Sequence, residues 1–469
     1  MQNLLKNVSI YFLGNVINRM MGFVIALIAT HFLSKNDIGI ANTLTDLINI
    51  FLTISSVQIW MAIIRYVCDY QKQENKFKII STGYFIQLIA FIGYTIIFLI
   101  LTFLKIIQNS AIELFILSIG YIFNQNIQFA CRGLEKNKLY AISGVFGSII
   151  NLISFIIFLF IFKLTYNALI LATACSYILQ GFFIEFFLKS FKHVNFKNIN
   201  IKTVKKMLKY SIPTTFNFIS YWINQSANKI ILTIFLSSEV TGLFSTAYKM
   251  NSLIGIFLMA FNFAFQEYSF NIYRNKLKNV IYNKTFNYFL RFISCGVLIL
   301  MPLTLFIFSF LIGEKYNSAK LLIPMLYLGC IFEALQNFLG SIMQAEKKVN
   351  QMFISQTFGA TVTILTMIIS IKYLKINSAT IAMVFCYFSV FITRIIALKP
   401  RIKIKFNLLY LLHYIPIFAL TSYFYLNYSL LANLLFLIFL IIYCLFCTFD
   451  LIKIVYVKFF SKFKKITGV

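Results

Sequence analysis

Long apolar runs follow one another along the whole chain, separated by short polar stretches. A helix needs about 20 residues to cross the ~30 Å hydrocarbon core of a membrane, and these runs have that length. Strands of a membrane barrel would instead be about ten residues long and alternating, a pattern that the sequence lacks. The runs predict fourteen transmembrane helices, at residues 7–31, 40–64, 79–104, 111–131, 139–162, 166–188, 208–236, 241–270, 281–311, 321–343, 349–371, 376–398, 408–427 and 430–457.

One segment of the chain occurs twice. "THFLSKNDIGIANTLTDLINIF" (residues 30–51) aligns with "TIFLSSEVTGLFSTAYKMNSLIGIF" (residues 233–257) at an offset of 203 residues. The two copies are identical at Thr30/Thr233, Phe32/Phe235, Leu33/Leu236, Ser34/Ser237, Gly39/Gly242 and Thr43/Thr246. A chance match between two Phe- and Leu-rich segments is the alternative. A true repeat in the same orientation predicts an all-α transporter of two six-helix bundles, related as parallel repeats, plus two C-terminal helices.

The longest polar stretch, "KSFKHVNFKNINIKTVKKMLK", divides the first six predicted helices from the other eight. It predicts four segments: an N-terminal bundle (1–188), a basic cytoplasmic linker (189–207), a C-terminal bundle (208–398), and two extra helices with a basic tail (399–469).

The distribution of positive charge predicts the topology. The 469 residues are 60% hydrophobic and 12% charged, with a mean hydropathy of +0.84 and a net charge of +29. If the N-terminus is cytoplasmic, 31 of the 42 Lys and Arg residues fall on the cytoplasmic side, 7 on the other side and 4 inside the spans. This is the positive-inside rule, so both termini are expected in the cytoplasm, and nucleic acid is not expected as a partner.

Motifs of enzymes and cofactor sites are missing from the sequence. It has no GxxxxGK[ST] phosphate loop and no Asp-x-Asp pair. His31, His193 and His413 lack the spacing of a metal site, and the eight Cys residues form no CxxC pair. We therefore expect no metal, cofactor, disulfide or enzymatic activity, and the first apolar run is predicted to be a retained helix.

Four cations lie inside the predicted spans: Arg19, Lys229, Lys249 and Arg291. A charge at the bilayer centre costs about 2.5–3.5 kcal/mol on insertion scales, so each is a candidate substrate-binding residue. Two alternatives stay open, a structural pair of Arg19 with Asp46 and snorkelling of Lys229 to the interface.

Two acids and several amides accompany these cations. Asp46 and Glu333 are predicted to neutralise them or to carry coupling protons, and the repeat suggests that Asp46 pairs with Lys249, its matching position. Four amide side chains are predicted either to line a polar cavity or to join helices: Asn18, Asn224, Gln225 and Asn228. The same two roles are open to Asn15, Asn217 and Asn251. Pro213 and Pro302 are expected to bend their helices.

Two further stretches carry a family resemblance. "YSIPTTFNFISYWINQSANKIILTIFLSSEVTGLFSTAYKMNSLIGIF" and "CRGLEKNKLYA" resemble the flippases of the multidrug/oligosaccharidyl-lipid/polysaccharide transporter superfamily that move lipid-linked O-antigen or capsule units. In the related lipid II flippases, a basic residue precedes "xxGFV" and another lies in the eighth helix. These roles fall on Arg19 in "NRMMGFV" and on Lys249. A second cation of the first helix falls on Ile25, which implies a glycan other than that of lipid II.

The resemblance implies a function. The chain is expected to move an undecaprenyl-diphosphate-linked oligosaccharide from the inner to the outer leaflet of the cytoplasmic membrane by alternating access. Its implied partners are this substrate, membrane lipid and polysaccharide-assembly proteins such as a polymerase. Two alternatives are a cation-coupled drug antiporter, which should have a carboxylate-rich site, and a glycan polymerase or ligase, which should have a large outer loop.

Overall fold

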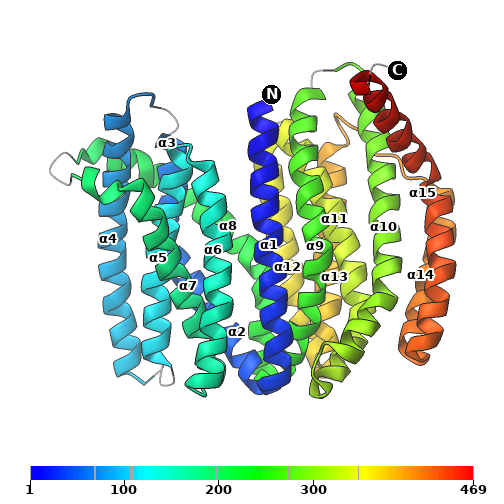
Figure 1. The fold of residues 1–469 in the computed structure, drawn as a ribbon, viewed down its shortest axis with the longest axis horizontal. Helices are drawn as coiled ribbons and strands as arrows, with labels where there is room; N and C mark the ends of the chain where they lie inside the picture. Colours follow the sequence, from blue (N-terminus) through cyan, green and yellow to red (C-terminus); the bar gives the residue numbers. More distant parts are fainter. Residues whose placement is uncertain are drawn as a thin grey trace. The chain divides into compact units, whose positions relative to one another are not determined.

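The computed structural model describes residues 2–67, 70–105, 110–195, 199–272, 275–346 and 348–467, and these are almost entirely helical (Figure 1). The α-helices are α1 Gln2–Phe32, α2 Lys35–Ser55, α3 Ile59–Val67, α4 Gln73–Phe103, α5 Ala111–Gly133, α6 Asn137–Ile156, α7 Tyr166–Leu188, α8 Ile201–Phe235, α9 Ser238–Ile272, α10 Lys278–Phe310, α11 Ile323–Ala345, α12 Val349–Leu374, α13 Asn377–Leu398, α14 Leu408–Asn427 and α15 Leu430–Thr467. Three short helical segments complete them: η1 Ile157–Ile161, η2 Ser190–His193 and η4 Glu314–Leu322.

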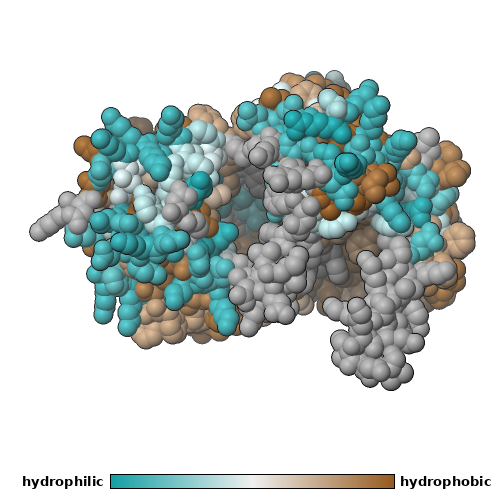
Figure 2. Space-filling view, turned by 90° about the horizontal axis from the view of Figure 1, so that it is seen from above, coloured by the Kyte–Doolittle hydropathy of each residue, from teal (hydrophilic) through white to brown (hydrophobic). Residues whose placement is uncertain are grey.

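The helices confirm an all-α polytopic membrane protein. Within the described residues, eleven helices are long and apolar enough to cross a membrane, and α1 and α8 contain the shorter apolar segments Val16–Phe32 and Ser226–Phe235. Large hydrophobic side chains such as Leu99 and Ile369 are exposed along the helices, as expected for surfaces that face lipid. Viewed end-on, the helix ends carry many hydrophilic residues, whereas hydrophobic residues lie at the sides (Figure 2).

One predicted span is broken in its middle. The prediction of a single helix over 40–64 is wrong, because α2 ends at Ser55 and α3 begins at Ile59. Val57 and Gln58 have φ angles of 48° and 46°, in the left-handed region that branched side chains avoid. Ser56 is fully buried, and its Oγ accepts a hydrogen bond of 3.0 Å from Gln87 Nε2 of α4.

Packing divides the chain into two compact units, Met1–Ser245 and Thr246–Val469. The first unit contains α1 to α8 and the first turns of α9, and the second contains the rest of the chain. In this division α8 belongs with α2 and α3, on which it packs. The boundaries predicted from the sequence, which put this helix in a second bundle, stay a prediction.

The core of the first unit combines apolar packing with satisfied hydroxyl groups. The Trp60 ring of α3 packs edge-on against Tyr121 of α5, with ring centroids 6.0 Å apart. The hydroxyl groups of Tyr94 and Ser118 are 2.7 Å apart in the buried interior. Because lipid offers no hydrogen-bond partner, this contact spares both hydroxyl groups the cost of burial without a partner.

Two glycines allow α2 and α9 to touch backbone to backbone. A Cβ atom on Gly39 would lie 1.7 Å from Ser238 O, and one on Gly242 would lie 1.9 Å from Lys35 O. The offset of 203 residues that relates Gly39 to Gly242 also relates Lys35 to Ser238, so the contact is reciprocal. The two repeated segments therefore cross through their shared glycine, which favours a true repeat over a chance match.

The core of the second unit is built from phenylalanine rings. Phe338 of α11 stacks on Phe265 of α9 at 4.0 Å between centroids and on Phe289 of α10 at 5.5 Å. Phe286 of α10 packs edge-on against Phe406, which follows α13, at 5.5 Å. The rings thus join three helices and the segment before α14.

That segment, residues 399–407, is called the strap here, and two asparagines of α10 hold it. Asn283 Nδ2 donates to Lys403 O (2.8 Å), and Asn283 Oδ1 accepts from Lys405 N (2.5 Å). Asn287 Nδ2 donates to Lys405 O and its Oδ1 accepts from Asn407 N, both at 2.9 Å. Each amide side chain therefore pairs with the strap backbone as a neighbouring β-strand would.

The glycine crossing yields a stability prediction. Gly39→Ala places a methyl group on the backbone of α9, so we expect a loss of several kcal/mol, on the order of other severe overpacking changes. Thermal unfolding of the purified protein in detergent measures it. Gly93→Ala in α4 is the matched control, because nothing lies within 4 Å of its Cβ position, and it should leave stability unchanged or slightly higher. Equal midpoints for the two variants would contradict the crossing.

Candidate functional site

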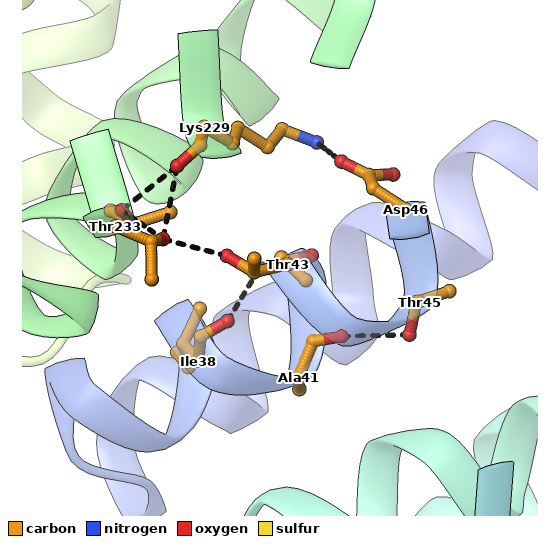
Figure 3. Close-up of polar contacts among 9 residues, drawn as sticks. Ile38, Ala41, Thr43, Thr45, Asp46, Lys229 and Thr233 are labelled. Atoms are coloured by element: carbon orange, nitrogen blue, oxygen red, sulfur yellow. Dashed lines mark hydrogen bonds and ion pairs between the residues drawn. The ribbon is translucent and has the colours of Figure 1, made fainter. Parts of the chain in front are cut away.

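Three threonines join α2, α8 and the start of α9 in the first unit (Figure 3). Thr233 Oγ1 lies 2.9 Å from Thr43 Oγ1 and 2.8 Å from Thr241 Oγ1. Thr233 and Thr241 also donate to the carbonyl oxygen of Lys229, at 3.0 and 3.3 Å. The repeat explains this placement in part, because Thr43 lies one helical turn after Gly39 and so faces the same crossing.

An ion pair lies beside this threonine cluster. Lys229 Nζ of α8 donates to Asp46 Oδ2 of α2 at 2.9 Å, and the two side chains point toward each other in Figure 3. Their exposed fractions are 14% and 19%, so both charges are largely withdrawn from solvent. A pair at this depth interacts more strongly than a surface pair, and each charge depends on the other for neutralisation.

The structure pairs Lys229 with Asp46, whereas the sequence suggested Arg19 or Lys249 as the partner of Asp46. The alternative that Lys229 only snorkels to the interface is not what the structure has, since its amine reaches Asp46. Arg19 is exposed on α1. Lys249 belongs to the second unit, and its pairing with Asp46 stays a prediction.

Helix capping fixes where the two repeated helices begin. Ser34 and Asp37 form a capping box at the start of α2, with Asp37 N donating to Ser34 Oγ at 3.0 Å. The matching Ser237 accepts from Val240 N at 3.3 Å at the start of α9. A second ion pair, Lys35 to Glu239 at 3.2 Å, lies near these caps. Both helices therefore start in register for the glycine crossing.

A polar pocket of about 260 Å³ lies between α1, α5, α6 and α7. Asn18 lines it and accepts a hydrogen bond of 2.9 Å from Ser148 Oγ. On the other side, Gln128 Nε2 donates to Asn124 (2.9 Å), whose Nδ2 donates to Gln180 (2.8 Å). Amides and hydroxyls without a charged lining residue suit the recognition of sugar hydroxyls. Asn18 thus lies in a polar pocket of the first unit, and its role in substrate binding stays a prediction.

Arg291 lies in a different environment from Lys229. Its guanidinium is 4.0 Å from Asp450 of α15 and 5.7 Å from the centre of the Tyr410 ring of α14. It lines a cavity of about 760 Å³ that is otherwise largely apolar, between α10, α14 and α15. The sequence did not predict Asp450 as its partner, and a role of Arg291 in substrate binding stays a prediction.

The other predicted site residues are distributed over both units. In α8, Asn224 and Asn228 are 2% and 1% exposed, as expected for amides that join helices, and the Gln225, Asn217 and Asn15 side chains lie outside the described residues. Glu333 of α11 and Lys249 of α9 are half-buried in the second unit. The described residues contain no group of three or more His, Cys, Asp or Glu side chains that could hold a metal ion.

Two buried charges were missed by the sequence analysis. Arg394 was counted with a cytoplasmic loop, but it belongs to α13 and is only 5% exposed. Its guanidinium donates to Gln336 O at 2.6 Å and to Ser355 Oγ and Gln356 Oε1 at 3.2 Å, joining α11, α12 and α13. Glu346 is the second. Its carboxylate pairs with Lys278 at 2.5 Å and with Arg401 at 3.4 Å. Glu346 lies in the polar stretch after the span predicted over 321–343, where a charge is ordinary. Arg394 lies only four residues from the end of the span predicted over 376–398, so it was grouped with the basic stretch that follows.

Comparisons with known proteins agree with this architecture. A family model described as "Polysaccharide biosynthesis protein" matches residues 4–265, more than half of the chain. The capsular polysaccharide biosynthesis protein CapF of Staphylococcus aureus is 23% identical over 362 residues, which cover 74% of this chain and 87% of CapF.

Solved transporter structures have the same fold. The lipid II flippase MurJ in an inward closed conformation matches with a TM-score of 0.71 and 18% identity, over 94% of this chain and 99% of MurJ. An inward-facing multidrug resistance MATE family transporter of the MOP superfamily matches with a TM-score of 0.64 and 15% identity, over 82% of this chain and 96% of that one.

The ion pair can be tested by a double-mutant cycle. Asp46→Ala and Lys229→Ala should each lower stability by roughly 1–3 kcal/mol, because each leaves the opposite charge unpaired. The double variant should lose clearly less than the sum of the two single losses. Chemical unfolding in detergent gives the four free energies. The exposed pair Lys35–Glu239 is the matched control and should show coupling below about 0.5 kcal/mol. Additive losses at Asp46 and Lys229 would show that the two side chains do not interact.

Proposed function

Because this chain belongs to the polysaccharide biosynthesis protein family, we propose that it is a flippase for a lipid-linked oligosaccharide. The substrate is an oligosaccharide repeat unit on undecaprenyl diphosphate, moved from the inner to the outer leaflet of the bacterial cytoplasmic membrane. It serves O-antigen, capsule or another surface polysaccharide. One observation carries the proposal. The chain belongs to a polysaccharide biosynthesis family, and over nearly its whole length it has the fold of a lipid II flippase.

The physical problem that such a protein solves is the passage of a hydrated sugar through lipid. Each hydroxyl group stripped of water without a new partner costs on the order of a few kcal/mol. Polar side chains inside a helical bundle remove this cost by replacing the water. The pocket that contains Asn18, Gln128 and Gln180 offers such partners in the first unit, and we assign it to the sugar.

The diphosphate of the carrier lipid needs cations at membrane depth. We assign this role to Arg19, Lys229 and Lys249, as the resemblance to lipid II flippases implies for the first and the last. Lys229 already pairs with the Asp46 carboxylate, and a phosphate oxygen that replaces the carboxylate would accept the same hydrogen bond. An inside-negative potential favours outward movement of the anion by about 2.3 kcal/mol per charge per 100 mV.

Alternating access would use the two repeats as the moving bodies. Both termini are proposed to be cytoplasmic, from the positive-inside distribution of Lys and Arg. Asp46 and Glu333 are the proposed sites for a coupling proton or for charge compensation, and a polysaccharide polymerase is a proposed partner.

A second candidate is a cation-coupled antiporter of small molecules. MATE transporters share this fold, which is the observation in its favour. Cationic drugs are held by carboxylates. Of the charged residues that lie at least six residues from either end of a predicted span, three are acids (Asp46, Glu333 and Asp450) and four are cations. The charge balance therefore favours an anionic substrate.

Transport by charge variants tests the proposal. Proteoliposomes are loaded with undecaprenyl-diphosphate-linked oligosaccharide, and its appearance on the far leaflet is followed with a membrane-impermeant glycosidase. Arg19→Ala and Lys249→Ala should each slow transport by about tenfold or more, which corresponds to at least ~1.4 kcal/mol of lost interaction. Arg19→Lys and Lys249→Arg should retain most of the rate, because they keep the charge.

Lys372→Ala, at the end of α12, is the matched control and should transport at the wild-type rate. Drug transport driven by a cation gradient, unaffected by Arg19→Ala and Lys249→Ala and without movement of the lipid-linked oligosaccharide, would replace the flippase by the antiporter.

A further inference from the structure

The strap presents a dense row of cations on the surface of the second unit. Lys399 and Arg401 lie in the turn that follows α13, and Lys403 and Lys405 lie in the extended part. All four are exposed, whereas the intervening Ile402 is 1% exposed. Side chains of an extended segment alternate between faces, so the lysines share one face and the apolar residues the other.

Asn283 and Asn287 fix this row in place. Their four hydrogen bonds to the strap backbone, at 2.5–2.9 Å, hold the extended segment against α10. Phe406 anchors its apolar face against Phe286. The cations of the strap repel one another, and the hydrogen bonds from Asn283 and Asn287 oppose this repulsion. The strap is therefore held in one conformation before a ligand binds, which lowers the entropic cost of binding.

The strap and α10 line an open cavity of about 720 Å³ at the surface. Lys284 of α10 adds a fifth cation to its lining. Arg401 shares the Glu346 carboxylate with Lys278. In the part of the chain that the structure describes, no carboxylate pairs with Lys284, Lys399, Lys403 or Lys405. The cavity therefore carries four positive charges that form no ion pair with an acid of the described residues.

The cavity lies at a membrane surface. One candidate span, Asn377–Leu398, ends just before the strap, and the next, Leu409–Asn427, begins just after it. Next to the strap, Ile396, Leu409 and Leu412 are 63%, 76% and 70% exposed, as expected for side chains that contact acyl chains. A ligand with an anionic head and a hydrocarbon tail fits both surfaces together.

We propose that this basic pocket binds the headgroup of a membrane lipid that carries two phosphates. Basic pockets beside transmembrane helices recognise lipids of this charge. The four positive charges of Lys284, Lys399, Lys403 and Lys405 exceed the negative charge of one phosphate group and suit two phosphate groups better. The proposal concerns α10 and the strap, not the residues assigned to transport, and it does not depend on which substrate the chain moves. Two lipids have this chemistry, a diphosphatidyl phospholipid such as cardiolipin and an undecaprenyl diphosphate.

Lipid binding to the full-length protein tests the proposal. Purified, delipidated protein in detergent is titrated with cardiolipin, undecaprenyl diphosphate, phosphatidylethanolamine and inorganic pyrophosphate, and bound lipid is counted by native mass spectrometry. The triple variant Lys399→Gln/Lys403→Gln/Lys405→Gln should weaken binding of a two-phosphate lipid by about tenfold or more. The control triple Lys320→Gln/Lys372→Gln/Lys375→Gln removes the same charge, two of its lysines lying at the opposite end of α13, and should change binding by less than about twofold.

Asn283→Ala provides a second test that keeps every cation. It should weaken lipid binding by a few fold while the protein stays folded, because it loosens the strap without changing its charge. If the strap triple does not fold, Lys403→Gln alone replaces it, with Lys375→Gln as its control.

The lipid that binds more tightly, cardiolipin or undecaprenyl diphosphate, identifies the source of the headgroup. Three results would overturn the proposal: unchanged binding in the strap triple, equal losses in both triples, or pyrophosphate binding as tight as that of either lipid. Transport and lipid binding are measured separately, so failure here leaves the proposed flippase function untouched.

Discussion

The contact of α2 with α9 through Gly39 and Gly242 is the constraint on which the first unit depends. Without side chains at these positions, the two helices meet backbone to backbone. This approach brings the threonines of α2, α8 and α9 within hydrogen-bond distance and sets Asp46 beside Lys229. Small residues at helix contacts are a common way to join membrane helices, since lipid supplies no hydrophobic force that would press them together.

Hydropathy alone predicted most of the fold. The spans at 166–188 and 408–427 match the bounds of α7 and α14, because each is bounded by polar residues on both sides. The break between α2 and α3 was not predictable. Its residues are apolar or neutral, and the hydrogen bond that Ser56 receives there comes from Gln87 of another helix. Local sequence predicts the bounds of a helix only where contacts with neighbouring helices do not change them.

The site was predicted less completely than the fold. Charge inside an apolar run identified Lys229 and Asp46 as candidates, but it did not pair them with each other. The pairing of Asp46 with Lys249, which the repeat suggested, stays a prediction. Glu346 and the Asn283–Asn287 pair gave no signal, and Arg394, near the end of a predicted span, was grouped with the basic stretch that follows it. Their partners are backbone atoms or distant side chains, and neither hydropathy nor motif spacing encodes such contacts.

The reciprocal glycine contact also bears on how the chain arose. Lys35 meets Gly242 as Ser238 meets Gly39, so the crossing has the two-fold character of an interface between identical subunits. A half-length chain with one such glycine would have a surface complementary to itself. Duplication and fusion of its gene would place both copies in one polypeptide, where each copy could diverge, as Asp46 and Lys249 differ at matching positions.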